Sequence, residues 1–169
     1  CKVIVQCSEE AQTLVDCQKW IDKSIVGNNY PEHDFYIPIG SLMNVLKHNP
    51  NHHEQTFPYI EVGLDTEDKE RRDKVNIGIV FETDRNSNAH DDESTEPGLF
   101  KDIFTEDHNV VCLDKYVTND TLPAYCNRHI EYSSLKELSQ EIRQLDLIIT
   151  VDHLVAHLAG ALDIDTILM

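Results

Sequence analysis

LDLIITVDHLVAHLAGALDIDTILM, residues 145–169, is the stretch that decides the fold. Residues 147–151 are almost continuously apolar or β-branched, which is typical of a strand buried on both faces. The apolar residues that follow have the spacing of a helix with one apolar face: Leu154, Val155, Leu158, Ala159 and Leu162. Residues 166–169 are again strand-like. The stretch therefore predicts a strand, a short helix and a second, parallel strand.

The turn between the first strand and the helix is the candidate site. In such a crossover the helix begins at the carboxyl edge of the sheet, and its first amides have no acceptor within the helix. We expect Asp152 to cap the helix by accepting from the amide of Leu154 or Val155. A helix start of this kind is a ready site for phosphate. His153 and His157 are four residues apart and share one polar face.

The spacing leaves three interpretations of this turn open. In the first, Asp152 only caps the helix and the two histidines only line its surface. In the second, the helix-start amides and the imidazole of His157 hold a phosphate-containing ligand. In the third, Asp152, His153 and His157 bind zinc. That site would lack a glutamate general base, because Leu-Val-Ala separates the two histidines.

The segment VDHLVAHLAGAL, residues 151–162, resembles the helix motif of the heptosyltransferase-like GT-B glycosyltransferases, the family 9 type. It is most similar to the branch found in bacterial tetratricopeptide-repeat proteins, whose pattern is roughly S-V-D-T-x-x-A-H-L-A-G-A-L-G-K-P. Val151, Asp152 and residues 156–162 match this pattern. His153 replaces the family's threonine, Leu154 replaces the next small residue, and residues 163–165 (Asp-Ile-Asp) replace Gly-Lys-Pro.

Weaker similarities to the same family extend along the chain. KVNIGIVF, residues 74–81, resembles the strand that opens the family's second domain, and residues 58–60 (Pro-Tyr-Ile) resemble the end of its first. The scattered matches nearer the amino terminus are Cys7, Leu14, Asp34, Pro38, Ser41 and Leu42. The resemblance spans most of this chain but only a middle portion of the family, and it implies a chain truncated at both ends.

The resemblance implies an α/β, GT-B-like fold of two Rossmann-like parallel-sheet halves, both incomplete. We expect residues 1–62 to be the C-terminal part of the first half and residues 75–169 to be the nucleotide-sugar-binding half. Residues 63–74 contain nine charged residues and are predicted to link them.

The function implied by the resemblance is a metal-independent glycosyl transfer that uses no cofactor. Asp152, His153, Leu154 and His157 would contact the diphosphate of the nucleotide-sugar donor, and the acceptor would be an unknown protein or glycan. The catalytic base would lie upstream of Cys1. The alternative is a catalytically decayed GT-B-like module that serves as an interaction scaffold.

The segment after the strand at residues 75–81 departs from the family. Residues 82–97 contain six acidic residues and no glycine, so they form neither a Walker loop nor a G-x-G-x-x-G fingerprint. Backbone approaches phosphate closely only where side chains are small. This segment is therefore expected to oppose donor binding.

The composition narrows the choice of partners. The chain has 14 Lys and Arg against 31 Asp and Glu, a formal charge of −17. Such a field repels nucleic acid and anionic membranes, and it also opposes a dianionic nucleotide sugar. No apolar run approaches the length of a membrane span, and the five cysteines form no C-x-x-C pair. These features indicate a cytoplasmic protein.

The rest of the chain predicts further elements of an α/β fold. Strands are expected at residues 2–6, 24–26, 35–38, 75–81 and 109–113, and helices at 8–20, from 41, at 99–104 and from 134. Ser134 and Glu137 form a capping box before an apolar stripe made of Leu135, Leu138, Ile142 and Leu145. His48, His52, His53 and Glu54 are interpreted as a polar loop rather than a metal site.

Overall fold

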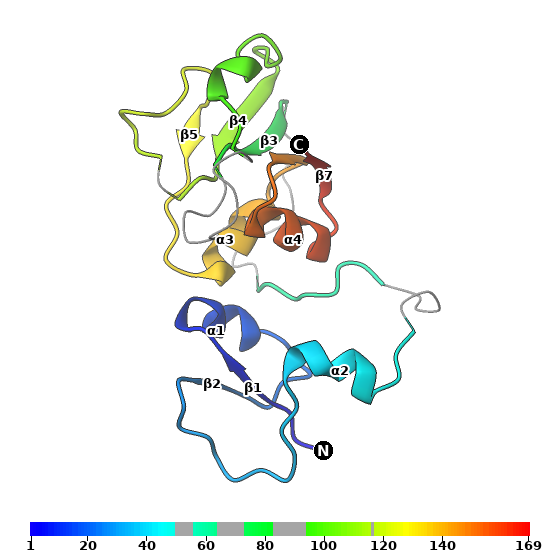
Figure 1. The fold of residues 1–169 in the computed structure, drawn as a ribbon. Coiled ribbons are helices and arrows are strands. Elements are labelled where there is room, and N and C mark those ends of the chain that lie inside the picture. The colour runs from blue at the N-terminus through cyan, green and yellow to red at the C-terminus, as the bar shows by residue number, and fades with distance from the viewer. Residues whose placement is uncertain (50–55, 64–72, 83–93, 116) are drawn as a thin grey trace.

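The computed structural model describes residues 1–49, 56–63, 73–82, 94–115 and 117–169. The largest unit is a five-stranded, wholly parallel sheet (Figure 1). Its strands are β3 (Val75–Val80), β4 (His108–Cys112), β5 (Arg128–His129), β6 (Leu147–Thr150) and β7 (Asp165–Leu168). The α/β class and the parallel sheets predicted from the sequence are confirmed.

The strands lie in the order β5-β4-β3-β6-β7 across this sheet. Counted from the first strand of the sheet this is 3-2-1-4-5, the order of the first five strands of a Rossmann fold. The chain moves outward from β3 through β4 to β5, and it then returns to the other side of β3 to add β6 and β7. The order of strands therefore reverses between β3 and β6.

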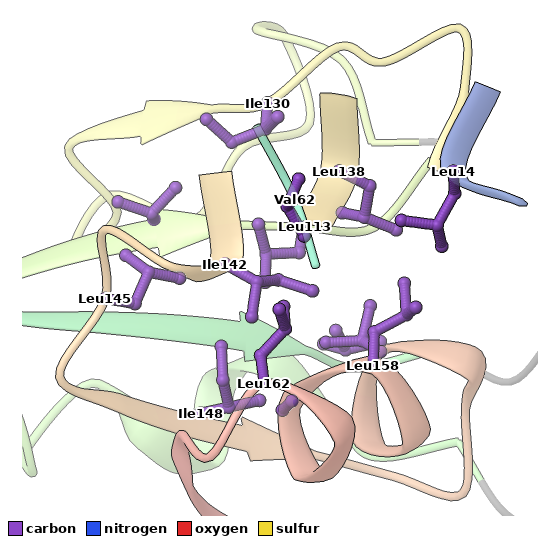
Figure 2. Packing of buried hydrophobic residues seen from close by; sticks show 14 of the residues in the cluster. Leu14, Val62, Leu113, Ile130, Leu138, Ile142, Leu145, Ile148, Leu158 and Leu162 are labelled. Carbon is purple, nitrogen blue, oxygen red and sulfur yellow. The ribbon is translucent and has the colours of Figure 1, made fainter. Parts of the chain in front are cut away.

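The two helices of this unit pack against one face of the sheet. They are α3 (Leu135–Ile142) and α4 (Leu154–Ala161). Ser134 caps α3 by accepting from the amide of Glu137, as the capping box predicted. The helices share a buried cluster with strand residues (Figure 2). The labelled residues of that cluster are Leu14, Val62, Leu113, Ile130, Leu138, Ile142, Leu145, Ile148, Leu158 and Leu162.

The other face of the sheet is covered by irregular chain and by η3 (Pro97–Phe100), a single 3-10 turn where a helix over residues 99–104 was predicted. Side chains of β3 alternate between the two faces, because Ile77 and Ile79 belong to this second cluster and Val80 to the first. Burial on both faces explains why the strand residues read as continuous apolar runs. The two-residue strand β5 was not predicted, because two residues carry no periodicity.

The amino-terminal part is a smaller unit. β1 (Ile4–Cys7) and β2 (Lys23–Val26) form a two-stranded parallel sheet joined by α1 (Glu9–Val15). Ser8 caps α1 as predicted, with its Oγ accepting from the amide of Ala11, but the helix ends at Val15 rather than near Trp20. In Figure 1, α1 lies between its own strands and α3.

The two units are joined by packing and by hydrogen bonds. Leu14 of α1 is buried in the same cluster as α3 and α4. Gln18, just after α1, donates to the carbonyl of Glu61 and accepts from its amide. The amide of Tyr59 donates to the carbonyl of Ala161 at the end of α4, and Val62 is buried in the core. Residues 59–62 therefore connect α1 to α3 and α4.

The region between β2 and residue 49 differs most from the prediction. Residues 35–38 form no strand, and α2 (Ile39–Val45) begins before Ser41, with Pro38 as its N-cap residue. The predicted inner stripe is wrong, because Leu42, Val45 and Leu46 are all exposed. α2 has no buried residue. The pattern indicated a helix correctly, but no described element covers it.

Two further predictions concern the remaining segments. His52, His53 and Glu54 lie outside the described residues, as do most of the predicted linker and of residues 82–97. In the ranges that the structure describes, no helix has the length and apolar character needed to cross a membrane.

Candidate functional site at the carboxyl edge of the sheet

The candidate site lies where the strand order reverses. β3 and β6 are hydrogen-bonded neighbours in register, with Val80 opposite Thr150. Their chains therefore leave the sheet side by side, through Phe81 and Glu82 after β3 and through Val151 and Asp152 after β6. In open α/β sheets, ligands bind outside the carboxyl ends of the strands at this reversal. The sequence placed Asp152 at this edge, and the structure agrees.

The cap of α4 is not the residue that was predicted. His153 is the N-cap residue, with extended backbone, and its Nδ1 accepts from the amide of Val155 at 3.2 Å. α4 begins at Leu154, so Asp152 is one residue too early to cap it. The prediction favoured aspartate because aspartate is a preferred cap and histidine is not.

Accepting at Nδ1 fixes the tautomer of His153. A neutral imidazole that accepts at Nδ1 carries its proton on Nε2, which makes Nε2 a donor. His157 lies one turn further along α4 and is exposed. The exposure of His157 agrees with the polar face that was predicted, whereas His153 is partly buried and precedes the helix as its N-cap residue.

Asp152 and Leu154 are both exposed. Asp152 is in solvent, and no residue in the described part of the chain donates a hydrogen bond to its carboxylate. Leu154 is 40% exposed, so its predicted place on the inner stripe is wrong. The other members of that stripe are buried as predicted: Val155, Leu158, Ala159 and Leu162.

Asp114 is a component of this edge that the sequence analysis missed. It follows β4 directly and is only 3% exposed. One carboxylate oxygen accepts from the amide of Phe81 at 3.0 Å, and the other accepts from the amide of Glu82 at 3.1 Å. Burial raises the pKa of Asp114 above its ordinary value, although these two amide hydrogen bonds act in the opposite direction. A carboxylate directly after a strand was the available signal, and it is the same signal that singled out Asp152.

Two thiols and a phenol lie next to Asp114. Burial raises the pKa of Cys112 and that of Cys126 to about 12, so both thiols are neutral and poor nucleophiles at physiological pH. Cys112 donates weakly to the Asp114 carboxylate. Tyr125 donates to the carbonyl of Pro97 at 2.7 Å, and its ring packs against Phe81. These residues are structural support for the edge rather than reactive groups.

The zinc hypothesis requires a set of converging ligands. Among the described residues, no three His, Cys, Asp or Glu side chains gather closely enough to hold a metal ion. Asp152, His153 and His157 therefore do not meet as a ligand set. His153 also uses Nδ1 for the cap.

Comparison with known proteins finds no matching family model, no matching curated protein and no matching solved structure. The resemblance of residues 151–162 to the glycosyltransferases is thus neither supported nor contradicted, and it stays a prediction. The function has to be inferred from the edge formed by β3, β4, β6 and α4.

Proposed function

We propose that this chain is a glycosyltransferase-like protein of GT-B type that binds a nucleotide-diphospho-sugar at the start of α4. The observation that supports this most directly is the position of the β6–α4 turn at the strand-order reversal, with Asp152 and His157 in solvent. The motif resemblance of residues 151–162 points to the same turn. The acceptor in this proposal is an unknown protein or glycan, as in tetratricopeptide-associated bacterial transferases.

The diphosphate would be held without a metal ion. The amide of Leu154 is the first of the helix and has no intrahelical acceptor, so it is available to an anion. The imidazole of His157, which is exposed on α4, adds a donor. Negative charge develops on the diphosphate as the sugar leaves, and donors fixed in place stabilise that charge.

The acidity of the chain limits how tightly such a donor binds. The formal charge of −17 repels a dianion, and Asp152 adds a carboxylate beside the helix start. We therefore expect weak binding that strengthens as salt screens the repulsion. This salt dependence is the reverse of that expected for a basic, phosphate-binding surface.

Titration of UDP and GDP into the isotope-labelled protein, followed by NMR, tests the proposal. We expect shifts at the amides of Leu154 and Val155, and we expect His157→Ala to weaken binding about tenfold while leaving the melting temperature nearly unchanged, because His157 is exposed. Lys136, partly exposed on α3, gives the control variant Lys136→Ala. No binding of either nucleotide at millimolar concentration would contradict the proposal.

A second candidate is a GT-B-like scaffold without catalytic activity. The observation that favours it is the exposed apolar surface of α2, where Ile39 is 88% exposed and Leu46 is 66% exposed. Exposed apolar surface of this kind marks interaction sites. A scaffold would also tolerate Leu154 and Asp152 beside the helix start. Absence of nucleotide binding, together with an intact fold, would favour this candidate.

A further inference from the structure

Asp114 has an unusual position among the carboxylates of the chain. Its two oxygens accept from two consecutive amides, those of Phe81 and Glu82, at the point where β3 leaves the sheet. β3 is the central strand and lies beside the strand-order reversal. Phe81 is buried at this point, and the partly exposed Glu82 that follows it lies at the edge at which the donor is proposed to bind.

Asp114 is itself fixed by a neighbouring strand. His129 of β5 donates from Nε2 to the backbone carbonyl of Asp114 at 2.8 Å. The carboxylate also accepts weakly from the thiol of Cys112. Asp114 is held by contacts with β4 and β5, and its carboxylate holds the chain after β3. The position of β4 and β5 therefore helps to fix the backbone at the reversal point.

The segment that begins at Phe81 is also held where it returns. The amide of Thr95 donates to the carbonyl of Phe81 at 2.9 Å, and Tyr125 donates to the carbonyl of Pro97. The Phe81 ring packs against Phe100 and Tyr125. Fixing the backbone of Phe81 therefore fixes both the departure and the return of this segment.

We propose that Asp114 is a positioning residue of the site: it holds the backbone of the buried Phe81 and so fixes where Glu82 emerges beside a ligand at the reversal between β3 and β6. This rests on the proposed function only for the identity of the ligand. Asp114 does not contact the ligand, because it is buried and both of its oxygens are already bonded.

A control residue lies at the opposite end of β3. Asp146 accepts from the amide of Asn76 at 2.9 Å, at the amino end of β3 and therefore on the far edge of the sheet. Asp114→Asn and Asp146→Asn make the same chemical change at residues that hold opposite ends of β3. In each, an amide group replaces a carboxylate, so that an NH2 donor takes the place of one of the two acceptor oxygens.

The first measurement is amide hydrogen exchange in the full chain. We expect Asp114→Asn to reduce protection about tenfold or more at Phe81 and Glu82, with Asn76 unchanged, because charge-assisted hydrogen bonds to these two amides are weakened. Asp146→Asn should reduce protection at Asn76 and leave Phe81 and Glu82 unchanged. Unchanged protection at Phe81 and Glu82 in Asp114→Asn would overturn the inference.

The second measurement is UDP binding. Asp114→Asn should weaken the Kd for UDP about tenfold, whereas Asp146→Asn should change it less than about twofold. Equal weakening by both variants would mean that Asp114 acts only through general stability, and it would overturn the positioning role. If the wild-type chain binds no UDP, the proposed function fails, and hydrogen exchange still decides whether Asp114 fixes Phe81 and Glu82.

If Asp114→Asn does not fold, a pH titration of the wild-type chain followed by NMR tests the same inference. Protonation of Asp114 removes its charge, so lowering the pH should shift the amide proton resonances of Phe81 and Glu82 together. The other titratable groups beside Asp114 are Glu82, Cys112, Cys126, Tyr125 and His129, whose Nε2 donates to the Asp114 carbonyl. Glu82→Gln and His129→Gln should each leave the joint shift in place. Loss of the shift in either variant would overturn the inference.

Discussion

α2 and α4 are two short helices that both carry apolar residues but lie in opposite environments. α2 has seven residues and buries none of them, whereas α4 has eight residues and buries Val155, Leu158, Ala159 and Ala161. The difference arises from what lies beside each helix. α4 follows β6 and packs onto the five-stranded sheet, while no described element covers α2. Apolar residues at helical spacing therefore predict a helix but not its packing partner.

The largest expected difference between the two helices is in the cost of truncating a leucine. Leu158→Ala in α4 should lower the free energy of unfolding by about 2–5 kcal/mol, because Leu158 is 7% exposed in a packed core. Leu46→Ala, at the end of α2, should cost less than about 0.5 kcal/mol, because that side chain is 66% exposed. Chemical denaturation measures both. Equal costs would mean that α2 is covered in solution.

The next largest effect concerns a glycine in the sheet that supports α4. A Cβ on Gly78 of β3 would come within 2.6 Å of Ile148 Cδ1 and 2.7 Å of Leu145 Cδ1, and both of those side chains are buried. Gly78→Ala should therefore destabilise the chain by about 1–3 kcal/mol through overpacking.

Gly40, within α2, is the control for that substitution. A Cβ there would meet nothing within 4 Å, so Gly40→Ala should be neutral or stabilise the chain by up to about 1 kcal/mol, because alanine favours the helix. A destabilising Gly40→Ala would indicate that the surface around α2 is not open. Thermal denaturation of the two variants side by side measures both effects.

A smaller effect distinguishes the two residues at the start of α4. His153→Ala should cost about 1 kcal/mol, because His153 supplies the acceptor for the amide of Val155. Asp152→Ala should leave stability nearly unchanged. His153→Ser should retain most of the stability, because serine is a favoured cap. If Asp152→Ala lost more stability than His153→Ala, Asp152 would be the residue that caps α4, as the sequence predicted.

The smallest effect is the pH dependence of stability that arises from Asp114, at the end of β3 beside the site. The pKa of Asp114 is raised in the folded chain, mainly by burial, so ionisation of Asp114 opposes folding. The raised pKa means that protonation of Asp114 stabilises the folded chain, and this contribution is complete below about pH 3.9, the ordinary pKa of aspartate. That contribution is lost as the pH rises through the folded pKa.

Comparison of wild type with Asp114→Asn isolates this contribution from the other acidic residues. The stability of wild type relative to the variant should fall as the pH rises from about 4 into the mildly acidic range, measured by denaturation at constant ionic strength. A relative stability that rises over this range would mean that the amides of Phe81 and Glu82 outweigh burial.

Much of the larger unit could be predicted from local sequence. Apolar runs gave β3, β4 and β6, and the capping box at Ser134 gave α3, because each of these signals depends on a few neighbouring residues. The position of Asp152 at the carboxyl edge also followed from the sequence. The strand order, which defines the reversal between β3 and β6, did not, since it depends on contacts between distant segments.

The two errors at the candidate site have different causes, one local and one long-range. Histidine is not a favoured cap, and only the extended backbone at His153 brings its Nδ1 to the amide of Val155. Asp114 follows a strand just as Asp152 does, but its partners Phe81 and Glu82 lie more than 30 residues earlier in the chain. The GT-B arrangement and the donor site depend on relations of this kind and remain proposals.

The position of β7 has a consequence for the behaviour of the protein at high concentration. β7 is hydrogen-bonded to β6 on one side, and no described strand pairs with its other side. The side chains of Ile167 and Leu168 are exposed. An edge strand of this kind is a template for strand addition between molecules. Mutual repulsion between chains of charge −17 opposes that addition near neutral pH. Acidification or high salt should therefore promote aggregation while each molecule is still folded.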